Sequence, residues 1–144
     1  ASTSVCIQKD IEETVMISMD FGDVKGYAFE SWLMPSSGKQ RDLIVVGSEK
    51  SAKIDYLKPQ ELRMFDIRIA ESISHGKKSF NVNDEGSYTI PIPYAEPLKE
   101  ELTHFLHCIK TREKPISDGV VGMRAVVMAE KALESSRTGR TVEF

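Results

Sequence analysis

The stretch PLKEELTHFLHCIK, residues 97–110, decides the fold class, because it predicts an amphipathic helix late in the chain. Pro97 suits the first turn of a helix. Residues 111–115 break this helix, and Ser117 or Asp118 can cap a second one. The second helix ends near Gly139, which can take the left-handed conformation found just after helices. The apolar residues of the first helix recur at helical spacing: Leu98, Leu102, Phe105, Leu106 and Ile109.

The preceding two thirds of the chain alternates between apolar and polar residues in short segments, which indicates β-strands. The run Leu43–Val46 is apolar throughout, so we expect this strand to be buried on both faces. Residues 72–86 are polar and mixed, and a loop or an irregular edge with a solvated His75 is expected there. Residues 141–144 are β-prone and are expected to rejoin the sheet. Strands are expected at residues 14–21, 24–33, 41–47, 52–57, 62–69 and 87–93.

Strands that precede the helices, rather than alternating with them, predict an α+β domain. We expect one largely antiparallel, open-faced sheet with the two C-terminal helices packed on one face. The second helix is apolar over much of its circumference, which favours burial between layers. The 144 residues suit a single domain over residues 1–144.

Composition excludes several classes of function. With 40% hydrophobic residues, 28% charged residues and a net charge of −3, the chain has no basic surface for nucleic acid. No apolar stretch approaches the roughly 18 residues that span a membrane. Cys6 and Cys108 match no metal or redox spacing, so we expect reduced thiols in the core of a cytoplasmic protein.

Motifs for catalysis or cofactor binding are scarce. No two glycines are separated by a single residue, and Gly119 and Gly122 follow no buried strand, so no dinucleotide site is predicted. Glu100, His104 and His107 share one stripe of the first helix and could ligate a metal. Without a fourth ligand, a solvated or interface face of the helix is the preferred interpretation. No catalytic residue, metal site or cofactor site is therefore assigned to this chain.

One segment does carry binding chemistry. Lys39 and Arg41 follow Trp32 and a Ser/Gly turn, and cations beside an aromatic ring can hold a phosphate or carboxylate while the ring stacks a sugar or base. The alternative is a solvated hairpin end with a core tryptophan. We predict Trp32, Lys39 and Arg41 as the substrate-binding residues.

Several stretches resemble a known family in their order and spacing. The C-terminal segments are residues 96–109, 114–119, 129–136 and 139–144, and the central ones are Ser31-Trp32-Leu33-Met34-Pro35 and residues 41–48. Together they are similar to the C-terminal half of the glucose-fructose oxidoreductase / inositol dehydrogenase (Gfo/Idh/MocA) family. The resemblance is nearest to members that act on nucleotide-linked amino sugars.

The resemblance implies that cofactor binding and substrate binding belong to different domains. In the family, an N-terminal Rossmann domain binds NAD or NADP, and the C-terminal sheet completes the sugar site and forms a dimer or tetramer interface. This sequence lacks the family's nucleotide glycine motif and its Gly-Gly-Gly…Asp…His segment. Glu113-Lys114-Pro115 matches the family's catalytic lysine triplet, but it follows an amphipathic helix instead of a Rossmann strand, so we interpret it as coincidence.

The resemblance therefore implies the substrate-binding and oligomerisation domain of an NAD(P)-dependent sugar dehydrogenase, which is not catalytic alone. Its expected partners are its own missing Rossmann domain and further copies, which would form a dimer or tetramer through the sheet. An alternative is a free-standing dimeric interaction module that uses the open sheet face. A third option is a single-domain metalloenzyme that uses His104 and His107.

Overall fold

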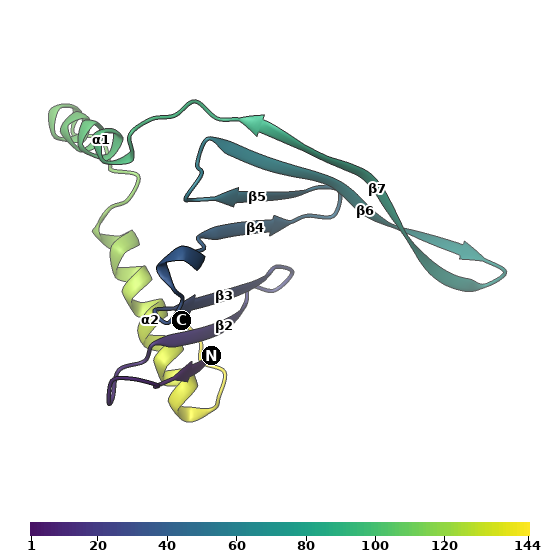
Figure 1. Cartoon of the computed structure of the whole chain (residues 1–144), viewed down its shortest axis with the longest axis horizontal. Coiled ribbons are helices and arrows are strands. Elements are labelled where there is room, and N and C mark those ends of the chain that lie inside the picture. Colours follow the sequence, from purple (N-terminus) through teal and green to yellow (C-terminus); the bar gives the residue numbers. More distant parts are fainter. The chain divides into compact units, whose positions relative to one another are not determined.

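The computed structural model describes residues 1–144, apart from the side chain of Ser36. It confirms an α+β fold with antiparallel strands and two C-terminal helices (Figure 1). The strands form two sheets, of three and of four strands, where one sheet was expected. The elements are β1 (Ser2–Ser4), β2 (Thr14–Asp20), β3 (Lys25–Ser31), a 3-10 turn (Ser36–Gly38), β4 (Asp42–Val46), β5 (Ser51–Asp55), β6 (Glu61–Ser74), β7 (Lys77–Pro91), α1 (Pro97–Thr111) and α2 (Gly119–Thr138).

The chain divides into two compact units, each described by itself. The first contains Ala1–Gly38 and Glu101–Phe144, and the second contains Lys39–Glu100. None of the described helices is long and apolar enough to cross a membrane.

In the first unit, the sheet has the order β1-β2-β3 and α2 lies against β1. The Thr3 amide donates a hydrogen bond to Ser136 Oγ at 3.0 Å, and the two hydroxyls lie 2.8 Å apart. Val15 and Ile17 share the face of Thr3 and are half-buried, as the alternation of this strand predicts. The small core of the first unit therefore lies on this side of the sheet.

The ends of α2 follow the sequence closely. Asp118 is the N-cap, and its carboxylate accepts a hydrogen bond from the Val121 amide at 2.9 Å. Gly139 takes the left-handed conformation with φ 66°, and its amide donates to the Ser135 carbonyl at 2.9 Å. Both caps, and the start of α1 at Pro97, are confirmed.

In the second unit, the sheet has the order β4-β5-β6-β7. Of the two alternatives for residues 72–86, the loop is wrong, because β6 continues to Ser74 and β7 begins at Lys77. The irregular edge is confirmed, because β7 is an edge strand whose pairing with β6 contains a bulge. His75 and Gly76 have φ values of 52° and 71°, which is the geometry of a two-residue hairpin turn. This turn lets the two strands pair along their whole length.

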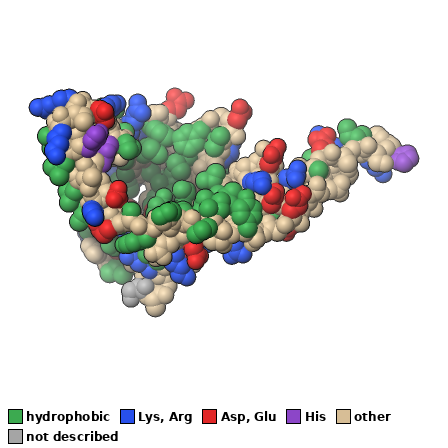
Figure 2. Space-filling view, turned by 90° about the horizontal axis from the view of Figure 1, so that it is seen from above, with side chains coloured by type: hydrophobic (Ala, Val, Ile, Leu, Met, Phe, Trp, Pro, Cys, Tyr) green, Lys and Arg blue, Asp and Glu red, His purple; other side chains and the backbone are tan. Residues whose placement is uncertain are grey.

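Burial is lower than the sequence suggests, and many hydrophobic side chains lie at the surface (Figure 2). The strand β4, expected to be buried on both faces, is an edge strand whose apolar residues are 47–78% exposed. An apolar run does not reveal whether a further layer covers the strand. The expected burial of α2 between layers is also wrong, since Ala132 is its one buried residue.

Two smaller expectations concern the chain ends and the cysteines. Residues 141–144 form no strand, although Phe144 packs edge-to-face on Phe21, with 6.4 Å between ring centroids. The core position is confirmed for Cys108, which is buried, and is wrong for Cys6, which is exposed.

Candidate functional site

Trp32 directly follows β3, and its side chain is 88% exposed. Its backbone is fixed, because the Trp32 amide donates a hydrogen bond to the Glu13 carbonyl at 2.9 Å. The next amide, of Leu33, donates to Ser31 Oγ at 3.1 Å. A large aromatic ring on a fixed backbone, with both faces open, is suited to stacking on a sugar or base. The alternative of a core tryptophan is wrong.

Lys39 and Arg41 lie in the exposed segment that leads into β4. The Arg41 carbonyl accepts a hydrogen bond from the Tyr56 amide at 2.8 Å, which ties this segment to the end of β5. No carboxylate among the described residues forms an ion pair with either cation. Both side chains are therefore available to an external anion.

The three predicted binding residues belong to different units, Trp32 to the first and the two cations to the second. Each has the exposure that ligand binding requires. Their grouping into one site stays a prediction.

The carboxylate of Glu13 was not singled out by the sequence, yet it is the most deeply buried charged group that the structure describes, at 6% exposure. It accepts hydrogen bonds from the amides of Cys6, Ile7 and Gln8, at 2.5 Å, 3.1 Å and 2.7 Å. These donors, Cys6 and then Gln8 above all, lower the pKa of Glu13 against the opposing effect of burial. Glu13 thus anchors the segment between β1 and β2. No sequence pattern marks it, because its partners are backbone groups.

The histidines of α1 have local partners. His104 Nε2 accepts a hydrogen bond from the Ile116 amide at 3.1 Å and lies 3.6 Å from Cys108 Sγ. His107 Nε2 lies 3.1 Å from a carboxylate oxygen of Glu113. Over the described part of the chain, no group of three or more His, Cys, Asp or Glu side chains could hold a metal ion. These histidines connect α1 to the segment before α2.

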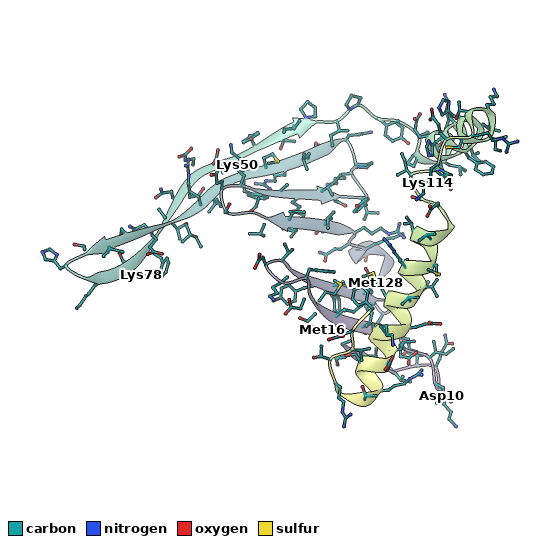
Figure 3. The ribbon with its side chains drawn as sticks, turned by 180° about the vertical axis from the view of Figure 1, so that it is seen from behind. Asp10, Met16, Lys50, Lys78, Lys114 and Met128 are labelled. Atoms are coloured by element: carbon teal, nitrogen blue, oxygen red, sulfur yellow. The ribbon has the colours of Figure 1, made fainter. Side chains whose placement is uncertain are left out.

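The triplet Glu113-Lys114-Pro115 lies between α1 and α2, as expected of a helix–helix connection. Lys114 Nζ pairs with the Asp118 carboxylate at 2.9 Å (Figure 3 labels Lys114). This ion pair, with the Val121 amide, lowers the pKa of Asp118. The charge of Lys114 therefore supports the cap of α2. Asp118 also accepts hydrogen bonds from the Val121 amide, through its carboxylate, and from the Gly122 amide, through its backbone carbonyl.

A cluster at the root of the β6–β7 hairpin was also not anticipated. Lys50 Nζ lies 2.7 Å from Asp66 Oδ2 and 5.8 Å from the centroid of the Tyr88 ring (Figure 3 labels Lys50). The hydrogen bond and charge of Asp66, with a smaller effect of Tyr88, raise the pKa of Lys50. This ion pair ties the turn before β5 to the place where the hairpin leaves the sheet.

Each unit also carries a shallow hollow. The one in the second unit has a volume of about 520 Å³, and the one in the first unit, on the exposed face of β2 and β3, about 420 Å³. The hollow of the second unit is lined by Tyr56, Leu57, Lys58, Pro59, Gln60, Glu61, Tyr94 and Pro97. The hollow of the first unit is lined by Ala1, Ser2, Met16, Ile17, Ser18, Tyr27, Ala28 and Phe29.

Comparison with known protein families gives a match over most of the chain. The family model described as "Oxidoreductase family, C-terminal alpha/beta domain" (GFO_IDH_MocA_C) matches residues 7–144. Neither the curated proteins nor the solved structures gave a match.

Proposed function

Because the chain belongs to the Gfo/Idh/MocA oxidoreductase family through its C-terminal α/β domain, we propose that it is the substrate-binding and oligomerisation domain of an NAD(P)-dependent sugar dehydrogenase. The match over residues 7–144 carries this proposal. The absence of a Gly-x-Gly pattern from these residues supports the assignment of NAD or NADP to another part of such an enzyme. We assign no cofactor site and no catalytic residue here, and Lys114 keeps its role at the α2 cap.

The proposed substrate is a nucleotide-linked sugar, with Trp32, Lys39 and Arg41 as its contacts. A pyrophosphate needs cationic donors, and Arg41 offers a planar fork that can bind two phosphate oxygens. The indole of Trp32 would stack on the sugar or base. The exposure of all three side chains, and the lack of ion pairs to the two cations, support this assignment.

Isothermal titration calorimetry with UDP-N-acetylglucosamine, a nucleoside-diphosphate amino sugar, tests the substrate proposal. A hydrogen bond to a charged group contributes about 1.5–3 kcal/mol, so Arg41→Ala should weaken binding by roughly ten- to a hundredfold. Lys58→Ala is the matched control, because Lys58 is an exposed cation of the same unit outside the proposed site. Equal affinities of the two variants would exclude Arg41 as a contact, and no heat from the unmutated chain would reject this substrate class.

We propose that the domain also associates with further copies through exposed sheet faces. Met16, Tyr27 and Phe29 lie exposed on the face of the first sheet opposite that of Thr3. Such faces also favour a second candidate, a free-standing dimeric module without a sugar site. Light scattering at high concentration tests both, since a strict monomer contradicts either one. Binding of the nucleotide sugar would separate the first function from the second.

We further propose a cytoplasmic location. Both Cys6 and Cys108 are free thiols, and free thiols are typical of a reducing compartment.

A further inference from the structure

The outer part of the β6–β7 hairpin forms an arm, which we define as residues 67–84. Only residues 62–65 of β6 pair with β5, whereas Ile67–Ser74 pair with β7 alone. The arm is therefore a ribbon of two strands that extends beyond the four-stranded sheet (Figure 1). A two-stranded ribbon is at best marginally stable in water without packing on one of its faces.

A β-bulge determines which side chains share a face of the arm. Phe65 pairs with Ser87 but Ile67 pairs with Asp84, so β7 contains one extra residue at this point. Gly86 accommodates the bulge with a φ of 97°. Because side chains alternate along a strand, the extra residue moves the following residues of β7 to the opposite face.

The bulge thereby gives the arm one apolar face. Val82 pairs with Ile69, and Phe80 and Ile73 lie further along the same face. Without the bulge, Phe80 and Val82 would lie on the other face, whose side chains are mostly serine, asparagine and the cations Arg68 and Lys77. These four apolar side chains are 65–70% exposed. No other element of the second unit lies over them, and such a patch marks an interaction surface.

The face also carries three charged side chains, Lys78 and Asp84 at its two ends and Glu71 beside Phe80, and these charges indicate what covers it. Lys78 lies near the tip (Figure 3), and Asp84 lies at the base. Lys78 pairs with Glu71 at 2.8 Å, and its Nζ lies 5.6 Å from the Phe80 ring centroid. Asp84 accepts a hydrogen bond from the Gly86 amide and forms no ion pair within the described part of the chain. Figure 2 shows side chains of both charges along the arm.

We propose that a second copy of this chain covers the apolar face of the arm, with the two arms antiparallel about a twofold axis that runs across the strands. This axis reverses the strand direction, so Lys78 of each copy faces Asp84 of the other. It also places Phe80 opposite Val82, and Ile73 opposite Ile67. Glu71, which pairs with Lys78 of its own copy, lies opposite Ile69. A twofold axis along the strands would instead set Lys78 against Ile73, and Asp84 against Ile67, and no opposite charges would meet. Charge complementarity therefore selects a second copy in the antiparallel arrangement.

The area of the arm limits its role. Eight residue pairs at about 3.3 Å each, and two strands about 4.8 Å apart, give a face of roughly 250 Å² per copy. A standard interface buries about 800 Å² per partner. The arm contact thus sets the register of two copies, and it rests on the proposed oligomerisation for the rest of the interface.

Disulfide trapping tests this register. In a Cys6→Ser background, which removes the exposed thiol, the double variant Lys78→Cys/Asp84→Cys should form a covalent dimer under mild oxidation. These positions lie about 20 Å apart within one strand, which is too far for a disulfide inside one copy. Each single variant should stay uncrosslinked, because each position faces the other one. Equal crosslinking of the single variants would overturn the antiparallel arrangement.

Charge reversal provides the second measurement, by sedimentation. Lys78→Asp should weaken self-association by about tenfold, as like charges then meet twice across the axis, and adding Asp84→Lys should restore it. Lys77→Asp, on the opposite face of the arm, is the matched control and should change nothing. A dimer that is insensitive to Lys78→Asp and lacks the crosslink would overturn the arm contact but leave sheet-mediated oligomerisation standing. A strict monomer at high concentration would overturn both.

Discussion

Two glycines of the same helix region should respond to the same substitution with opposite signs. Gly122 lies inside α2, whereas Gly139 follows it with φ 66°. A Cβ added at either position would meet no atom within 4 Å. Packing therefore does not distinguish the two positions, and the backbone conformation decides the outcome.

The magnitudes follow from that conformation. Glycine inside a helix costs about 0.8–1.0 kcal/mol relative to alanine, so Gly122→Ala should stabilise the chain by nearly that amount. Alanine in the left-handed region costs about 1–2 kcal/mol, so Gly139→Ala should destabilise it. Unfolding entropy is about 2.1 cal/mol/K per residue, or roughly 0.3 kcal/mol/K for 144 residues. The expected shifts in Tm are therefore about +3 °C for Gly122→Ala and about −3 to −7 °C for Gly139→Ala.

Thermal unfolding followed by circular dichroism at 222 nm measures both shifts. The double variant serves as a control for additivity, because the two positions share no partner. Shifts of the same sign in the two single variants would refute the assignment of Gly139 to the left-handed cap.

Other predictions rest on equally local features. Arg112 takes the left-handed conformation after α1, with φ 63°, so Arg112→Gly should raise Tm by about 3 °C in the same thermal scan, and a fall would contradict that geometry. The pKa of Glu13 is lowered from its ordinary value of 4.5, so its contribution is present above that value and is lost as pH falls through the lowered pKa. Urea titrations between pH 6 and 3 should show a smaller acid loss of stability for Glu13→Gln, and an unchanged profile would exclude this role. Cys6 is exposed and Cys108 is buried, so a thiol reagent should label Cys6 at once and Cys108 only on unfolding, whereas two fast phases would contradict the burial of Cys108.

Local signals explain what the sequence predicted well. The alternation of Val15 and Ile17 marks β2, and the caps at Asp118 and Gly139 define α2, because these patterns depend on residues a few positions apart. The β6–β7 arm was not predicted as a strand pair, because it lacks such local signals. Its strands are rich in Ser, Asn and Lys, and the bulge at Gly86 interrupts the period of two.

Features that depend on distant groups were not predictable. Glu13 binds backbone amides, which no sequence pattern encodes. The exposure of β4 depends on which layers cover it, and an apolar run does not encode those layers. For the candidate site, the sequence identified side chains with suitable chemistry at Trp32, Lys39 and Arg41, but spacing along the chain does not fix their grouping.

We propose that these residues form the substrate half of an oxidoreductase and that the nucleotide cofactor binds to another domain. Trp32 is the one tryptophan of the sequence and lies in the proposed site, so its fluorescence reports on binding of UDP-N-acetylglucosamine. In a parallel titration, the fluorescence of NADH itself reports on NADH binding. We expect a saturable change with the nucleotide sugar and none with NADH after correction for absorbance. Micromolar NADH binding, or no response to the sugar, would contradict this proposal.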